Sequence, residues 1–177
     1  DIFNYDVVAD SAGSYVDSIT DFLDGTDTLT VTIDRSSDSA GRTINGNVTA
    51  GQASVQAAQD ALTGEIGQAI YVTDTGHLYI NANSDNLFTS LDYKIKVNSG
   101  ATAKSTFDAT NDDNIVWTLT GGSGADTITG AGLADTLTGG AGNATISGLA
   151  GADIISAVSG DNTLTGGAGI DTITGGT

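Results

Sequence analysis

Aspartate recurs at multiples of nine residues in the last third of the chain, between residues 121 and 174. Asp126, Asp135, Asp153 and Asp171 hold equivalent places in this spacing, and Asn162 holds the same place in another interval. A short carboxylate on a turn can accept hydrogen bonds from backbone amides, or it can bind a hard cation that prefers oxygen ligands. The spacing therefore favours two kinds of chemistry, turn formation and calcium binding.

Glycine and aliphatic residues share this period. The segment divides into six consecutive rows of nine residues, GGSGADTIT, GAGLADTLT, GGAGNATIS, GLAGADIIS, AVSGDNTLT and GGAGIDTIT. Glycine gathers in the first four places of the rows. One aliphatic residue fills every eighth place: Ile128, Leu137, Ile146, Ile155, Leu164 and Ile173. The register does not slip over the six rows, which is typical of a solenoid built from identical units.

The rows resemble the RTX nonapeptide GGxGxDxUx, in which U is a large aliphatic residue. This resemblance covers residues 121–174 and implies a parallel β-roll that binds Ca²⁺ as its cofactor. Six residues of each row would form a turn and three a short strand. The resemblance also implies that the calcium ligands are the Asp carboxylates, together with carbonyl groups from the second and fourth places of each row.

Two rows of such a roll complete one coil of eighteen residues, so alternate rows stack on the same sheet. The second, fourth and sixth rows then align Asp135, Asp153 and Asp171, which predicts two complete calcium sites on one face. Asp153 serves both sites, so its replacement is expected to be the most damaging single change in the roll.

The other face is predicted to be impaired. The first, third and fifth rows align Asp126, Ala144 and Asn162, and Ala144 has no ligand atom in its side chain. Asn143 and Asp161 lie beside these places as partial substitutes. The alternative that remains open is a calcium-free solenoid rich in glycine and threonine, in which aspartate serves the turns alone.

The first residues are similar to the segment that follows the roll in serralysin-type proteases and some bacterial surface-layer proteins. The matching residues are Asp1, Phe3, Ile19, Asp21, Phe22, Gly25, Asp27 and Leu29. Asp1 has the phase of a sixth place and Phe3 that of an eighth. This resemblance implies that Asp1 ends a roll whose earlier rows precede it, and Asp1 is a further candidate metal ligand.

The fold class predicted is all-β with one short helix. Alternating patterns predict strands at 28–34, 69–73, 77–81, 93–97 and 114–120, a short strand near Ile44, and a hairpin around Asp74–Gly76. One helix is expected within 52–62. The expected domains are a β-rich domain at 1–113 and a roll at 114–177 that is open at its C-terminal end. Trp117, at a sixth place, is expected to cap the open end of the roll core.

The charge of the chain limits its partners. The formal net charge is −17, from 22 acidic and five basic residues, so nucleic acid and anionic membranes would be repelled. Cysteine is absent, which excludes disulfides and thiolate metal sites. No apolar run is long enough to insert into a membrane. These features fit a secreted bacterial protein without disulfides.

No catalytic residues are predicted. The sequence has no HExxH zinc motif, no G-x-S-x-G nucleophile elbow and no Walker-type loop. The single histidine, His77, is expected to be a surface residue. The five tyrosines outside the roll favour core packing over a sugar-binding platform. Asn47 and Asn143 fit the acceptor pattern for glycosylation.

Three functions are consistent with these observations. The favoured one is a secreted, non-enzymatic calcium-binding structural protein of a bacterial cell surface. It would form part of a surface layer, filament or repetitive adhesin, with head-to-tail self-association. The second is an adhesin module that binds a cell-surface glycan or a protein. The third is the secretion and folding domain of an RTX enzyme.

Overall fold

The computed structural model describes residues 2–5, 17–19, 28–35, 39–46, 48–52, 54–61, 63, 65–72, 77–81, 93–99, 102–103 and 115–177. These ranges are almost entirely β-structure. Their strands are β1 (Ile2–Tyr5), β2 (Asp17–Ile19), β3 (Thr28–Asp34), β4 (Thr43–Asn45), β5 (Val48–Gln52), β6 (Ala69–Val72), β7 (His77–Ile80), β8 (Tyr93–Ser99), β9 (Thr102–Ala103), β10 (Ile115–Thr120), β11 (Thr127–Thr129), β12 (Thr136–Thr138), β13 (Thr145–Ala150), β14 (Ile154–Ser156), β15 (Thr163–Ala168) and β16 (Thr172–Thr174). One helix, α1 (Val55–Asp60), lies within the expected segment and is shorter than it. No helix in the described part combines the length and apolar character needed to cross a membrane.

The chain divides into two compact units. The first comprises Asp1–Thr30 and Asn47–Asn114, and the second comprises Val31–Gly46 and Ile115–Thr177. The domains predicted from the sequence, 1–113 and 114–177, place residues 31–46 in the N-terminal domain. They belong instead to the second unit, because β4 pairs with β11 there, Ile44 lying opposite Ile128.

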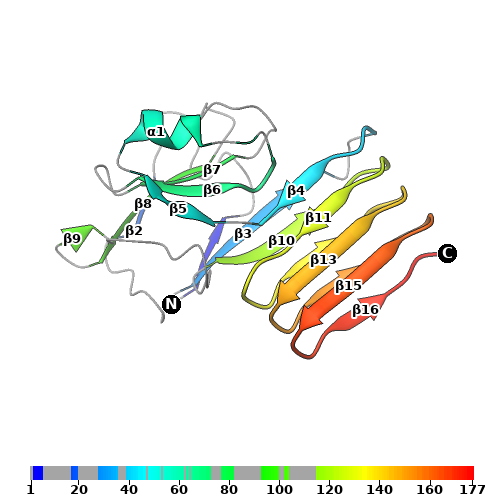
Figure 1. The fold of residues 1–177 in the computed structure, drawn as a ribbon. Coiled ribbons are helices and arrows are strands. Elements are labelled where there is room, and N and C mark those ends of the chain that lie inside the picture. The colour runs from blue at the N-terminus through cyan, green and yellow to red at the C-terminus, as the bar shows by residue number, and fades with distance from the viewer. Residues whose placement is uncertain are drawn as a thin grey trace. The chain divides into compact units, whose positions relative to one another are not determined.

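The second unit is a parallel β-roll, as the nine-residue period predicts. Its strands alternate between two sheets, β3-β10-β12-β14-β16 and β4-β11-β13-β15. In Figure 1 the strands from β10 to β16 form a regular ladder coloured from green to red. Each residue pairs with the one eighteen places later, such as Leu137 with Ile155 in one sheet and Ile128 with Ile146 in the other. The expected two-row coil is therefore confirmed.

The aliphatic eighth places form the core of the roll. Leu119, Ile128, Leu137, Ile146 and Ile155 are almost completely buried. The threonines that flank them suit short strands, because a β-branched side chain packs well on a pleated surface. Burial weakens in the last coil, where Leu164 is half-buried and Ile173 is 47% exposed.

Glycine permits the tight turns between these strands. The fourth-place glycines of the last three rows, Gly151, Gly160 and Gly169, have φ angles of 123°, 98° and 132°. Residues other than glycine rarely adopt such positive φ angles. A Cβ at any of the three positions would also lie within 3.0 Å of the main chain of the stacked turn. The glycines thus allow the turns to stack as closely as the strands.

A discontinuous segment supplies the first coil of the roll. Residues 31–46 contribute the end of β3, whose Ile33 is buried, and all of β4. The amide of Arg35 donates to the carbonyl of Thr120 at 2.8 Å, which continues the pattern made by Gly121 and Thr138 one coil later. The expected cap at Trp117 is therefore wrong. Trp117 is fully buried inside the roll, because β3 lies beside β10 and Gly46 lies against the indole ring.

The first unit contains a second sheet, with strand order β2-β8-β7-β6-β5. β6 and β7 are antiparallel, with Ile70 opposite Tyr79, which confirms the predicted hairpin. Ile66, Ile70, Leu78 and Ile80 form a fully buried core. His77 is half-buried, with its ring centroid 6.0 Å from that of Tyr79, so it is not the surface residue that was expected.

Candidate calcium sites

The structure stacks the predicted column of aspartates in one line along the roll. Asp135 and Asp153 are each 1% exposed and precede β12 and β14, while Asp171 is half-buried before β16. Each carboxylate accepts a hydrogen bond from the backbone eighteen residues earlier. Asp135 Oδ1 accepts from Trp117 N at 2.8 Å, Asp153 Oδ1 from Asp135 N at 2.8 Å, and Asp171 Oδ1 from Asp153 N at 3.0 Å.

The second carboxylate oxygens of the column differ. Asp135 Oδ2 accepts from the second-place amide of its own row, Ala131 N, at 2.7 Å. Asp153 Oδ2 is buried and has no hydrogen-bond partner. The second place of its row is Leu149, which has a φ angle of +73° and pairs with Gly167 in the ladder between β13 and β15. The local turn thus leaves Asp153 with an unmatched acceptor inside the roll.

Burial disfavours negative charge in this column. Desolvation raises the pKa of Asp135 to about 7, against hydrogen bonds from Trp117 and Ala131 that lower it, and the charge of Asp153 raises it further. Desolvation also raises the pKa of Asp153; the hydrogen bond from Asp135 opposes this, and the charge of Asp171 adds to it. A stack of desolvated carboxylates with one unmatched oxygen is an environment that a divalent cation would stabilise.

In the opposite column, formed by Asp126, Ala144 and Asn162, the side-chain oxygens of Asp126 and Asn162 accept hydrogen bonds from backbone amides. Asp126 Oδ1 accepts from Arg42 N at 2.7 Å, and its Oδ2 accepts from Gly122 N at 2.9 Å. Ala144 is buried at the next sixth place, and its amide donates to Asn162 Oδ1 at 2.9 Å. This arrangement favours the stacking of turns without a metal ion.

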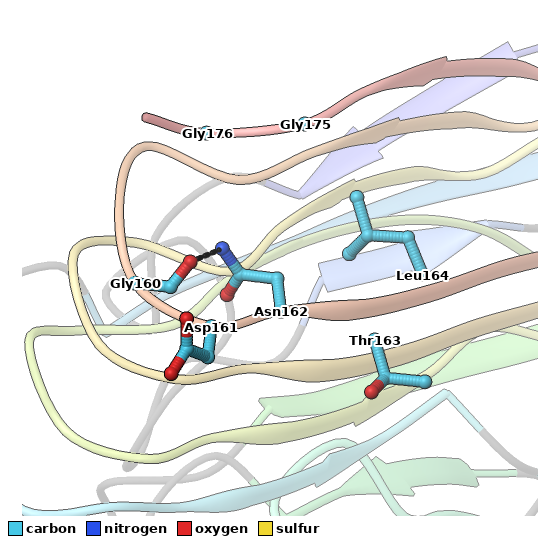
Figure 2. Close-up of a pocket in the computed structure, with 7 residues that line it drawn as sticks. All are labelled: Gly160, Asp161, Asn162, Thr163, Leu164, Gly175 and Gly176. Atoms are coloured by element: carbon cyan, nitrogen blue, oxygen red, sulfur yellow. Dashed lines mark hydrogen bonds between the residues drawn. The ribbon is translucent and has the colours of Figure 1, made fainter.

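Asn162 lies at the edge of this second column. Its Nδ2 donates to the carbonyls of Ser159 and Gly160, at 3.2 and 2.9 Å. Figure 2 shows the bond to Gly160. Asn162 is one of the residues that line a hollow of about 390 Å³. The residues that line it are Gly160, Asp161, Asn162, Thr163, Leu164, Gly175 and Gly176. The sequence did not predict this hollow, although the adjacent Asp161 and Asn162 mark its polar wall.

Asn143 extends the polar edge of the same column. It is exposed, and its Oδ1 accepts from Asp161 N at 2.9 Å. Asn143 and Asp161 therefore join two stacked turns, and their role as substitutes for a missing calcium ligand stays a prediction. Asn47, the other candidate for glycosylation, lies outside the described residues.

Calcium held in the aspartate column would need carbonyl oxygens as well as carboxylates. Among the described residues, no three histidine, aspartate or glutamate side chains converge on one point. A second-place carbonyl lies in the stacked turns of this column, where Ala131 O accepts from Ala150 N at 3.1 Å. A carbonyl oxygen has two lone pairs, so such a bond leaves capacity for a cation. The donor set of the column therefore fits calcium.

The family model of the RTX calcium-binding nonapeptide repeat, in four copies, matches residues 118–145, 129–162 and 156–177. Residues 118–177 are RTX repeats. Such repeats bind calcium, and the proteins that carry them are typically secreted. No curated protein and no solved structure matches the chain.

The RTX match does not extend to the N-terminal segment that resembles the post-roll region of serralysins. Phe3, Ile19 and Leu29 lie in β1, β2 and β3. Their predicted companions Asp1, Asp21, Phe22, Gly25 and Asp27 lie outside the described residues, so the ligand role of Asp1 stays a prediction.

The carboxylates of Asp135, Asp153 and Asp171, with carbonyls of the adjacent turns, are the groups that would hold calcium in this RTX roll. Bound calcium would supply positive charge to a region where burial opposes ionised carboxylates. One oxygen of each side chain accepts a hydrogen bond from a backbone amide of the preceding coil, so the carboxylates join successive turns without a metal ion.

Proposed function

We propose that the chain is a secreted, non-enzymatic structural protein of a bacterial cell surface that calcium folds into its working form. It would form part of a surface layer, an extracellular filament or a repetitive adhesin. The observation that supports this most is the column of Asp135, Asp153 and Asp171, in which two carboxylates are buried and one oxygen is unmatched. The column joins the turns of the roll, so its charge state controls whether the roll is stable.

Calcium concentration would control where the protein folds. At the low calcium level of a bacterial cytoplasm, ionised carboxylates in the column repel one another and oppose folding. At the higher level outside the cell, calcium offsets this repulsion and binds the folded roll in preference to the unfolded chain. Folding after export is consistent with type I secretion, which we include in the proposal.

End-to-end assembly is the second part of the proposal. β15 and β16 are the last strands of their sheets, and the eighth-place Ile173 beside that edge is 47% exposed. A strand edge of this kind accepts a further coil of the same repeat, which a second copy of the chain can supply. A repeated contact of this head-to-tail kind produces filaments or lattices.

Both parts can be tested on the whole chain with calcium and with a chelator. Calcium should increase the β-signal in circular dichroism, raise the unfolding midpoint and release heat of binding in isothermal titration. Analytical ultracentrifugation should then show species larger than the monomer in calcium alone. Absence of any calcium response would refute the calcium-folding proposal. A monomer under both conditions would refute the assembly proposal and leave calcium folding intact.

A further inference from the structure

The two turn edges of the roll differ in chemistry. One edge is made by the second, fourth and sixth rows, residues 131–134, 149–152 and 167–170, with the sequences AGLA, LAGA and GAGI. It has no polar side chain, and we call it the apolar turn edge. The opposite edge, residues 122–125, 140–143 and 158–161, has the sequences GSGA, GAGN and VSGD and includes the hollow of Figure 2. The roll is therefore amphipathic from edge to edge.

Large aliphatic side chains on the apolar turn edge are exposed. Leu149 is 50% exposed and Ile170 is 89% exposed, while Leu133 is half-buried between exposed or partly exposed alanines and glycines. None of these side chains occupies an eighth place, so the core of the roll does not require them. An edge that exposes large aliphatic side chains and carries no polar one commonly marks a contact surface.

Leu149 adopts an unfavourable backbone conformation at the centre of this edge. Its φ angle is +73°, and Gly167, which pairs with it in the next coil, has a φ angle of +113°. Glycine or asparagine adopts positive φ readily, whereas a leucine does so at an energetic cost. The cost and the exposure together indicate that the leucine side chain has a role other than packing within the chain.

Charge identifies the occupant that fits this edge. The chain carries a net charge of −17, so two copies repel each other over most of their surfaces. The apolar turn edge has no charged side chain. Two copies can therefore come into contact through this edge without removing water from a carboxylate on it. A second copy also presents the same eighteen-residue repeat, so aliphatic side chains of one edge can lie over the small residues of the other.

We propose that the apolar turn edge is a lateral contact surface for a second copy of this chain. The two copies associate edge to edge with Leu149 at the centre of the contact. Three turns bury less than the roughly 800 Å² per partner of a standard stable interface, so one such contact is weak and gains strength in a repetitive assembly. This lateral contact is independent of the end-to-end contact proposed above.

Sedimentation of the full chain in calcium, over a concentration series, tests the lateral contact. Leu149→Asp should weaken self-association at least about tenfold, because it places a carboxylate in the contact. Val158→Asp is the matched control, since Val158 has the second place of its row on the opposite edge and is 61% exposed. It should leave the association constant within about twofold of the parent.

Leu149→Asn separates a contact role from a structural role. Asparagine tolerates positive φ, so in chelator this variant should unfold at the same temperature as the parent or higher, and yet in calcium it should associate more weakly. Ile173→Asp removes the exposed aliphatic residue of the proposed end-to-end contact and should leave the lateral dimer in place.

The lateral contact is refuted by three results. One is a parent chain that stays monomeric in calcium up to about millimolar concentration, well above the range of weak specific contacts. Another is equal association by the parent, Leu149→Asp and Leu149→Asn. The third is a monomeric chain that binds neutral phosphatidylcholine vesicles through Leu149, which would make a lipid surface the occupant.

Discussion

At the scale of single residues, Asp153 differs from Asp135 in the same column. Asp135 uses both carboxylate oxygens as hydrogen-bond acceptors, whereas Asp153 Oδ2 has no partner. The second place of the row is Ala131 for Asp135 and Leu149 for Asp153, and Leu149 has a φ angle of +73°. The two turns thus differ in backbone conformation and in the number of hydrogen bonds that the carboxylate accepts.

Asp153→Asn should separate the structural and metal roles of this residue. The amide keeps the Oδ1 acceptor for Asp135 N and removes a charge that burial opposes, so the metal-free roll should become more stable at neutral pH. The stabilisation by calcium should fall sharply. Chemical unfolding with calcium and with a chelator measures both effects.

Two other variants complete this comparison. Asp153→Ala should destabilise the metal-free roll by about 1–3 kcal/mol, because the amide of Asp135 loses its acceptor. Asp126→Asn changes the opposite column and should alter the calcium response least. A greater loss of calcium response in Asp126→Asn than in Asp153→Asn would contradict the assignment of the two faces.

The raised pKa of Asp135 predicts the pH dependence of the metal-free protein. Its pKa rises from 3.8 to about 7 in the folded roll, so between these values the folded state binds more protons than the unfolded state. The free energy of unfolding should therefore fall as pH increases from about 4 to 7, by up to about 4 kcal/mol. Urea unfolding in chelator at several pH values measures this slope.

The slope also has an internal control. Asp135→Asn removes the titrating group and should flatten the profile over the same pH range. If the metal-free protein instead became more stable as pH rose, the carboxylate would be stabilised in its ionised form and the proposed need for a cation would be lost.

At the scale of elements, β3 and β4 complete the roll at the end where the aspartate column stops. Val31 and Arg42 hold the sixth places of this first coil, so neither of its rows supplies a carboxylate there. Trp117 holds the sixth place of the next row, in β10, where it fills the core, and its amide donates to Asp135. The aspartate column is thus attached by a hydrogen bond to a row that has no carboxylate.

Gly46→Ala tests the packing of this coil. A Cβ at Gly46 would approach Trp117 Cδ1 and Cγ at 2.7 Å, and the buried indole has little room to move. The variant should lose about 1–3 kcal/mol of stability, measured by thermal unfolding in calcium. Gly175→Ala is the control, because its Cβ would meet nothing within 4 Å, and its effect should stay within about 0.5 kcal/mol. Equal effects of the two changes would show that the indole does not pack as described.

At the scale of the whole molecule, the roll is discontinuous in sequence. Residues 31–46 join residues 115–177, and the intervening residues 47–114 belong to the other unit. The bond from Arg42 N to Asp126 Oδ1 joins residues 84 positions apart. Folding of the roll therefore requires closure of a long loop, which costs conformational entropy before the stacked rows contribute.

A fragment of residues 114–177 tests this dependence. It contains every predicted repeat and lacks the first coil, so it should show little β-signal in calcium or unfold at a clearly lower temperature than the full chain. A fragment in which a flexible linker joins residues 28–46 to residues 114–177 should recover most of the difference. Full stability of the shorter fragment would show that the first coil is dispensable.

The sequence by itself determined the architecture of the repeated part. The period of nine predicted the coil of eighteen, the aliphatic core and the alignment of Asp135, Asp153 and Asp171, because each row repeats the same local turn and strand. It also predicted the hairpin of β6 and β7. These features depend on local patterns that can be counted along the chain.

Only the tertiary structure decided which residues complete the roll and how each carboxylate is satisfied. The sequence predicts a short strand near Ile44, but the place of β4 beside β11 follows from a contact distant in sequence. The unmatched oxygen of Asp153 and the exposure of Leu149 depend on one backbone angle and on neighbouring coils. Hydrogen bonding and desolvation are properties of an assembled environment, and a list of residues does not contain them.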